Sequence, residues 1–113
     1  SSWAGKEVSL LSGVTYTSSK HAVNAMTETI NMKYCNVGIR ACALCPGEVA
    51  TPILDKRPKK LTTEQKNKML QPDDLGETIA FLCQMPKHVC INQLTISPTW
   101  HRRYISDLGI EEL

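Results

Sequence analysis

The residues with the clearest chemical potential are Tyr16 and Lys20, which lie in the run Tyr-Thr-Ser-Ser-Lys. In a helix, positions four residues apart share one face, with Cβ atoms about 5–6 Å apart. An ammonium held that close to a phenol favours the phenolate form. A tyrosine in that setting can pass a proton to or from an alcohol or carbonyl oxygen, which an upstream hydroxyl at Ser2 can help to hold. Taken alone, this spacing is more often that of an exposed tyrosine beside a lysine than of a catalytic pair.

A second set of candidate residues lies in the run Pro-Gly-Glu-Val-Ala-Thr at residues 46–51, directly after a short apolar stretch. In open parallel α/β sheets, ligands bind at the carboxyl ends of the strands. Gly47 lets the backbone approach a ligand closely, and Thr51 offers a hydroxyl and a backbone amide. An ordinary turn at the end of a strand is the alternative interpretation.

A helix over residues 16–34 must carry the tyrosine–lysine pair. Ala22, Met26 and Ile30 recur every four residues, so one face of this helix is apolar. Residues 1–15 lack periodicity and are rich in serine, glycine and threonine, which predicts a loop before the helix.

Two short apolar runs, residues 39–45 and 91–97, predict buried strands. Between them, Thr62 with Gln65 forms a capping-box pattern that opens a short helix, and Pro72 begins a longer one. The buried stripe predicted for the longer helix consists of Leu75, Ile79, Leu82 and Cys83. A strand–helix–strand order requires a parallel pair with cover on both faces. The predicted fold is therefore α/β with a doubly wound parallel sheet, of which two strands alone are too few.

Composition limits the classes of protein that this chain can belong to. Its 113 residues allow one domain at most, and 42% hydrophobic with 21% charged residues is typical of a globular protein. No apolar run approaches the roughly 18 residues of a membrane span. A net charge of +2 indicates neither a nucleic-acid nor a membrane partner. Five cysteines without framework spacing favour a reducing, cytoplasmic setting. The opening without an initiator methionine predicts a piece of a larger protein.

Together these residues resemble the short-chain dehydrogenase/reductase family. Residues 1–5, Ser-Ser-Trp-Ala-Gly, are similar to the family's Ser-Ser-x-x-Gly segment, and residues 16–20 to its Tyr-x-x-Ser-Lys motif. The run Pro-Gly-x-Val-x-Thr at 46–51 is similar to the segment that contacts the nicotinamide end of the cofactor. The three motifs occur in the family's order within residues 1–98.

The resemblance implies an NAD(P)-dependent oxidoreductase that interconverts a small-molecule alcohol and a carbonyl, with NAD or NADP as cofactor. Residues 1–113 would be the C-terminal half of one Rossmann-like domain. Tyr16 would be the general acid/base, and Lys20 would bind the nicotinamide ribose. Ser2, with Ser1 as the fallback, would position the substrate oxygen and converge on the tyrosine hydroxyl.

The resemblance also assigns residues to the cofactor and to a subunit interface. Pro46 and Gly47 would approach the nicotinamide, Val49 would meet its carboxamide through the backbone, and Thr51 would hydrogen-bond nearby. The helix over residues 16–34 matches the family's dimerisation helix, which implies a homodimer or homotetramer.

The chain departs from the family pattern in several places. The distance from Ser2 to Tyr16 is one residue longer than is common, which predicts a bulged loop, and His21 stands where a small residue is usual. The family's Gly-rich phosphate turn, Asn-Ala-Gly segment and catalytic asparagine are not among these residues, and none of the six glycines forms a Gly-x-Gly cluster. The alternative hypothesis is therefore a non-catalytic fragment that acts as an interaction or dimerisation module.

Other possible sites favour structural interpretations. Cys42 and Cys45 lie three apart on a predicted strand and point to opposite faces, which favours core packing over a redox pair. Cys83, His88 and Cys90 lack a fourth ligand at metal-site spacing, so no metal is predicted. The basic run at 56–60 is typical of a solvated loop, and in the family this region is a lid over the substrate. No element is predicted for residues 100–113.

Overall fold

Two parallel strands, β1 (Ala43–Pro46) and β2 (Gln93–Ile96), form the centre of the structure, a computed structural model that describes residues 1–111. The register pairs Ala43 with Gln93 and Pro46 with Ile96. Both strands run in the same direction because the chain returns through a helical crossover between them. The predicted α/β class with a parallel sheet is confirmed.

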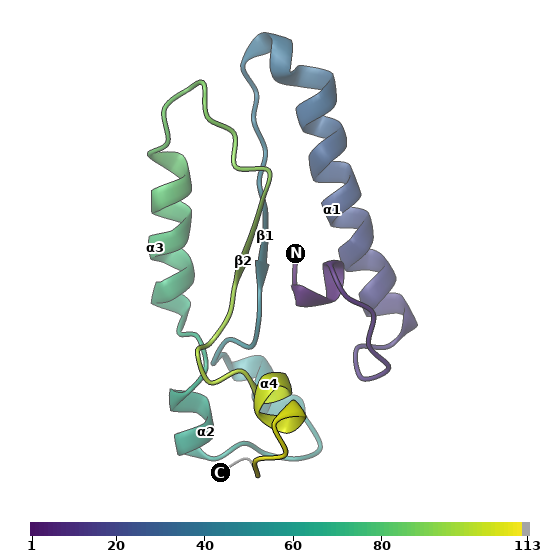
Figure 1. Ribbon diagram of the computed structural model, residues 1–113, viewed down its shortest axis with the longest axis vertical. Helices are drawn as coiled ribbons and strands as arrows, with labels where there is room; N and C mark the ends of the chain where they lie inside the picture. The colour runs from purple at the N-terminus through teal and green to yellow at the C-terminus, as the bar shows by residue number, and fades with distance from the viewer. Residues whose placement is uncertain (112–113) are drawn as a thin grey trace.

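Two long helices flank the strands on opposite sides (Figure 1). Helix α1 (Val14–Tyr34) precedes β1, and α3 (Pro72–Cys83) forms the crossover to β2. Helices on both sides of a parallel sheet are the layer arrangement of doubly wound folds. None of the helices in residues 1–111 is long and apolar enough to cross a membrane.

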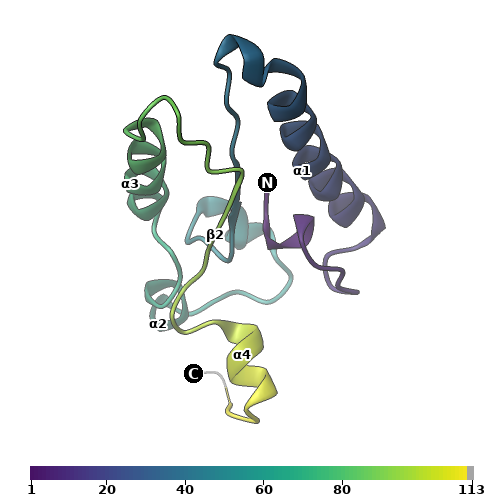
Figure 2. The same cartoon turned by 45° about the horizontal axis from the view of Figure 1, so that its top comes forward.

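The short elements gather beyond the carboxyl ends of the strands, at the end of the molecule where α1 begins (Figures 1 and 2). They are the helices α2 (Thr63–Asn67) and α4 (Arg102–Asp107) and the 3-10 turn η3 (Pro52–Lys56). The predicted capping box at the start of α2 is confirmed, since Thr62 and Gln65 exchange two side-chain-to-backbone hydrogen bonds of 2.9 and 3.1 Å. Helix α4 lies in the tail for which the sequence predicted no element.

Strand β1 is shorter than the predicted run at 39–45, and the side chain of Asn31 explains why. Its amide nitrogen donates to the Ala41 carbonyl at 2.8 Å, and its amide oxygen accepts from the Ala41 N–H at 2.6 Å. Asn31 is buried, so its amide occupies both backbone groups of Ala41 as a neighbouring strand would. The ladder therefore begins only at Ala43, and β2 is correspondingly shorter than predicted.

The apolar face predicted for the first helix is not its buried face. The buried positions of α1 are Thr17, Thr27 and Asn31, and the Thr27 hydroxyl is satisfied by the Val23 carbonyl at 2.8 Å. Met26 on the apolar face is 57% exposed. Small polar side chains that hydrogen-bond to nearby backbone let the helix lie close to the first turn of the chain. Ala22 and Met26 of the apolar face are therefore not part of the core of residues 1–111.

The predicted buried stripe of α3 is only partly covered. Leu75 and Leu82 are half-buried, whereas Ile79 is 50% exposed and Cys83 is exposed. Two strands offer too narrow a surface to cover a helix of this length. Within residues 1–111 the buried apolar side chains are few and lie along the strands and near their carboxyl ends: Ala4, Ala43, Cys45, Leu54, Met69, Leu70 and Ile105.

Candidate active site

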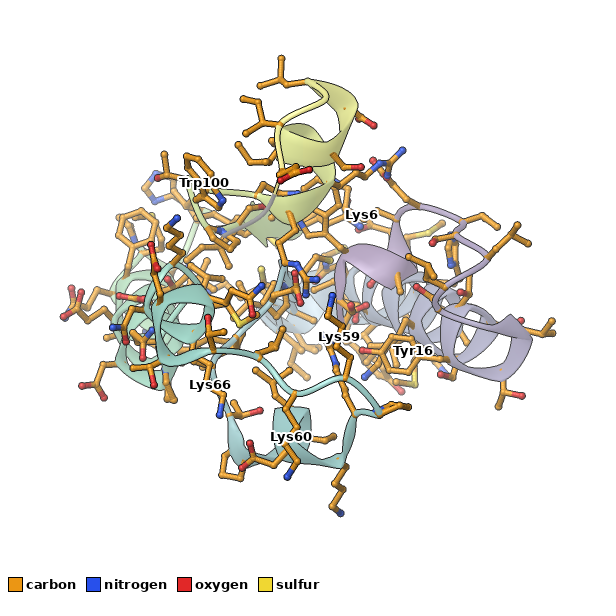
Figure 3. The ribbon with its side chains drawn as sticks, turned by 90° about the horizontal axis from the view of Figure 1, so that it is seen from below. Lys6, Tyr16, Lys59, Lys60, Lys66 and Trp100 are labelled. Carbon is orange, nitrogen blue, oxygen red and sulfur yellow. The ribbon has the colours of Figure 1, made fainter. Side chains whose placement is uncertain are left out.

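Tyr16 and Lys20 lie on one face of α1, as their spacing predicts. The Lys20 Nζ atom lies 5.3 Å from the centroid of the Tyr16 ring. Tyr16 is 48% exposed and Lys20 is half-buried, so the phenol is open to a ligand while the lysine is held against the protein. Figure 3 shows Tyr16 projecting from α1 at the end of the molecule that carries the short elements.

The first five residues, here called the serine segment (residues 1–5), pack against α1 one turn beyond Tyr16. The Ser1 hydroxyl donates to the Lys20 carbonyl at 3.2 Å, and the Asn24 side-chain amide donates to the Gly5 carbonyl at 2.9 Å. A Cβ atom at Gly5 would come within 2.8 Å of the Lys20 carbonyl oxygen. Only glycine permits this approach, so Gly5 fixes how closely the segment lies to the helix that carries the tyrosine.

Ser2 begins a single 3-10 turn, η1 (Trp3–Gly5), and its hydroxyl accepts a hydrogen bond of 3.1 Å from the Ala4 N–H. This bond orders the side chain and leaves the hydroxyl proton of Ser2 for another acceptor. Within residues 1–111, no hydrogen bond joins Ser2 to Tyr16. The structure thus brings the serine segment to the tyrosine helix without a direct bond between these two hydroxyls.

The segment that leaves β1, here called the β1 loop (residues 46–51), is held on both sides. The Gly47 N–H donates to the Ile96 carbonyl at 2.8 Å, which extends the parallel pairing past the strand. The loop then pairs with Leu70, whose N–H donates to the Glu48 carbonyl and whose carbonyl accepts from the Ala50 N–H.

This pairing leaves the backbone of Val49 pointing away from Leu70. Successive residues of an extended chain direct their backbone groups to opposite sides, and Leu70 takes the groups of Glu48 and Ala50. In the part of the chain that the structure describes, no hydrogen bond involves the Val49 N–H or carbonyl. An extended segment with one donor and one acceptor free on the same side is complementary to a carboxamide.

Ion pairs connect the β1 loop and the following turn η3 to α2 and α4. Glu48 accepts from Arg57 at 3.1 Å and from Arg102 at 3.3 Å, and Lys66 pairs with Asp55 at 3.0 Å. These groups are partly exposed, so each pair contributes only about 0–1 kcal/mol. The pairs therefore orient η3 and α2 beside the β1 loop without locking them.

Sequence reasoning missed Asn24 and Glu48. Asn24 lies four residues after Lys20, and this spacing alone could have placed it beneath the serine segment. Glu48 carries no such signal, because Arg57 and Arg102 reach it only through the fold.

The two central cysteines behave as packing residues. The side chain of Cys45 is 0% exposed. Burial also raises the pKa of the Cys42 thiol, with smaller contributions from Cys45 and Cys90. A raised pKa keeps the thiol protonated and unreactive. Among residues 1–111, no three His, Cys, Asp or Glu side chains are grouped to hold a metal ion.

Comparison with known proteins agrees with this geometry. The family model described as short chain dehydrogenase matches residues 1–62. The chain belongs to this family. It is 35% identical over 85 residues to a farnesol dehydrogenase of Aedes aegypti, an alignment that covers 74% of this chain and 33% of the relative.

Solved structures of the family superimpose on most of this chain. A beta-ketoacyl-ACP reductase from Bacteroides thetaiotaomicron matches with a TM-score of 0.66 and 31% identity, over 80% of this chain and 37% of the other. An alcohol dehydrogenase from Thermococcus sibiricus, complexed with 5-hydroxy-NADP, matches with a TM-score of 0.60 and 28% identity, over 77% and 35%. Family membership supports NAD or NADP as the cofactor. The chain spans about a third of the length of the curated relatives it matches.

Proposed function

We propose that the intact protein is an NAD(P)-dependent oxidoreductase that interconverts a small-molecule alcohol and a carbonyl. The observation that carries the proposal is the Tyr16–Lys20 pair, with the ammonium 5.3 Å from the ring of a half-exposed tyrosine. Membership of the short chain dehydrogenase family supports the same chemistry. The proposal is made for the protein that includes a dinucleotide-binding half, because residues 1–113 contain no Gly-rich phosphate turn.

In this proposal, Tyr16 is the general acid/base. Its hydroxyl donates a proton to the carbonyl oxygen during reduction and accepts one from the alcohol during oxidation. Lys20 holds a positive charge beside the phenol, which stabilises the phenolate in the oxidation direction. Ser2 donates its remaining hydroxyl proton to the same substrate oxygen and so fixes the oxygen beside Tyr16.

The cofactor's nicotinamide end fits the groups at the carboxyl end of β1. Its carboxamide would pair with the free N–H and carbonyl of Val49, and Thr51 would add a side-chain hydroxyl. Gly47 and Pro46 keep the loop close to β2, and Lys20 would reach the ribose hydroxyls. When bound, the nicotinamide ring supplies or accepts the hydride.

We further propose a homodimer or homotetramer formed through α1. Met26 on its apolar face and Met32 elsewhere on the helix are 57% and 76% exposed. A second copy, or the protein's own dinucleotide-binding half, is the natural cover for such a surface. A cytoplasmic setting is proposed from the five free cysteines.

The test is Tyr16→Phe in the intact protein, measured as NADH- or NADPH-dependent reduction of a panel of aldehydes and ketones. We expect turnover to fall by about 10²–10⁴-fold, because the phenol proton is lost while the ring remains. Dinucleotide affinity should be retained.

The matched control is Tyr34→Phe. Tyr34 lies at the other end of the same helix, and Lys33 holds its ammonium 5.4 Å from that ring. We expect this variant to turn over at the parent rate. Parent-level turnover in Tyr16→Phe under saturating substrate would contradict the proposal.

The alternative function is a non-catalytic interaction module. It is favoured by the exposed apolar side chains of α1, Met26 and Met32. The two functions differ in one measurement: a module binds no NADH or NADPH in the longest product of its gene, whereas the enzyme binds one of them.

A further inference from the structure

Trp3, the residue after Ser2, joins the serine segment to the far end of the chain. Its indole Nε1 donates a hydrogen bond of 2.8 Å to the Ser97 hydroxyl, across 94 positions of sequence. The indole is half-buried, so this bond is partly shielded from water. Ser97 belongs to residues 95–104, here called the C-terminal segment, which comprise the end of β2 and the chain that follows it.

Stacked rings strengthen the same connection. The Trp3 and His101 ring centroids lie 4.3 Å apart, and His101 stacks on Tyr104 at 4.3 Å. Tyr104 also meets the indole edge-on at 5.8 Å. Aromatic pairs at such separations prefer defined orientations, so the indole is fixed in direction as well as in position.

The residues that follow Trp3 bind the same part of the chain. The Lys6 ammonium donates to the Thr95 hydroxyl at 2.7 Å, and Glu7 pairs with Arg103. Three residues of the run 3–7, namely Trp3, Lys6 and Glu7, therefore contact the C-terminal segment. The opposite side of the serine segment is tied to α1 through Ser1 and Gly5.

We infer that Trp3 is a positioning residue, which sets the place of Ser2 by anchoring it to the C-terminal segment. In the chain, Ser2 lies between Ser1, which binds α1, and Trp3, which binds the C-terminal segment. Because the Ser2 hydroxyl also accepts from the Ala4 N–H, any rotation of the Trp3 backbone moves that hydroxyl. The inference rests on the proposed function, since it concerns the serine that holds the substrate oxygen.

A consequence is that Ser97, His101 and Tyr104, the residues that contact the indole, influence turnover without contacting the substrate. Loss of the indole anchor leaves the serine segment tied directly to α1, with Lys6 and Glu7 as the remaining links to the C-terminal segment. A hydroxyl displaced by about 1 Å can cost up to 10²-fold in rate, so the effect should appear in kcat.

The experiment uses the intact protein with the matched pair Trp3→Phe and Trp100→Phe. Trp100 contacts Lys68 instead, with the ammonium 4.2 Å from its ring, and has no recorded bond to the serine segment. We expect Trp3→Phe to lower kcat by about 10- to 100-fold with an unchanged KM for the dinucleotide, and Trp100→Phe to keep the parent kcat. Circular dichroism and thermal midpoints should match between the two.

Two further variants separate positioning from general support. Ser97→Ala should lower kcat in the same direction as Trp3→Phe, and Ser97→Thr, which keeps the hydroxyl, should restore it. In a Ser2→Ala background, Trp3→Phe should cause little additional loss, because the residue on which it acts is gone.

Three outcomes would overturn the inference: a kcat of Trp3→Phe equal to that of Trp100→Phe, an equal loss in the presence and absence of Ser2, or no effect of Ser97→Ala. If Tyr16→Phe is inactive in the same preparation, these outcomes refute the role of Trp3 and leave the proposed function intact. Parent-level turnover of Tyr16→Phe would instead refute the proposed function itself.

Discussion

Residues 1–113 expressed alone should be neither cooperatively stable nor able to bind dinucleotide. The structure exposes 8059 Å² of surface, whereas a folded monomer of 12.6 kDa exposes about 6,200 Å². Its radius of gyration of 16.1 Å also exceeds the roughly 13 Å of a domain of this length. The excess surface of about 1,900 Å² is thus comparable to one side of a large subunit interface.

The size of this excess decides the expected outcome. Somewhat over half of this excess surface is apolar, and burial of apolar surface contributes about 25 cal/mol per Å². The isolated chain therefore lacks on the order of 25 kcal/mol of hydrophobic stabilisation. The net stability of a whole domain is only about 5–15 kcal/mol. Much of the loss lies on α1 and α3, where Met26, Met32, Ile79 and Phe81 are all exposed. In addition, β1 and β2 each have one neighbour, which leaves unpaired backbone along both outer edges.

The assay is urea or thermal unfolding of the isolated 113-residue chain, followed by circular dichroism, with NADH and NADPH binding by fluorescence. We expect a broad, non-cooperative change, concentration-dependent association and no dinucleotide binding. A matched control is the intact protein, which should unfold cooperatively and bind one dinucleotide. A sharp transition of a monomer together with micromolar dinucleotide affinity would refute the reasoning from exposed surface.

Two further predictions concern the intact protein. Asn31→Ala should lower the free energy of unfolding by about 2–4 kcal/mol, because both backbone groups of Ala41 lose their buried partner. Asn92→Ala, whose exposed amide contacts only Glu28, should change it by no more than about 0.5 kcal/mol in the same urea titration. Burial lowers the pKa of His101 against a smaller opposing effect of Glu48, so folding favours the neutral ring. The contribution of His101 to the free energy of unfolding should therefore be fully present above about pH 6.5 and decrease as the pH falls below this value. His101→Phe should flatten this pH dependence of stability. An unchanged slope in the variant would contradict the assignment to His101.

Local patterns in the sequence predicted the elements that depend on few neighbours. The capping box at Thr62 and the start of α3 at Pro72 appear as predicted, because both are built from residues within one turn. The strand at 39–45 was predicted too long, since nothing in a local pattern shows that a side chain from α1 takes both backbone groups of Ala41.

The apolar stripe of α1 shows a different limit of sequence reasoning. Periodicity correctly indicated an amphipathic helix, but it does not say which surface covers the apolar side. In residues 1–111 the strands pack on the polar side, where Thr27 hydrogen-bonds to the helix backbone and Asn31 to the backbone of Ala41. The apolar side is therefore left for a surface that these residues do not supply.

In the candidate site, too, some positions follow from local sequence and others depend on residues far along the chain. Tyr16 and Lys20 face one another because a helix of any sequence puts them there. The position of Ser2 instead depends on two non-local features. Gly5 lets the serine segment lie against α1, and the Trp3 indole binds Ser97, which lies 94 residues further along the chain. Compared with the family pattern, this chain has one residue more than is common between Ser2 and Tyr16. Under the proposal made for Trp3, the anchors on both sides of the serine segment set the separation of these two residues whatever the length of the intervening loop.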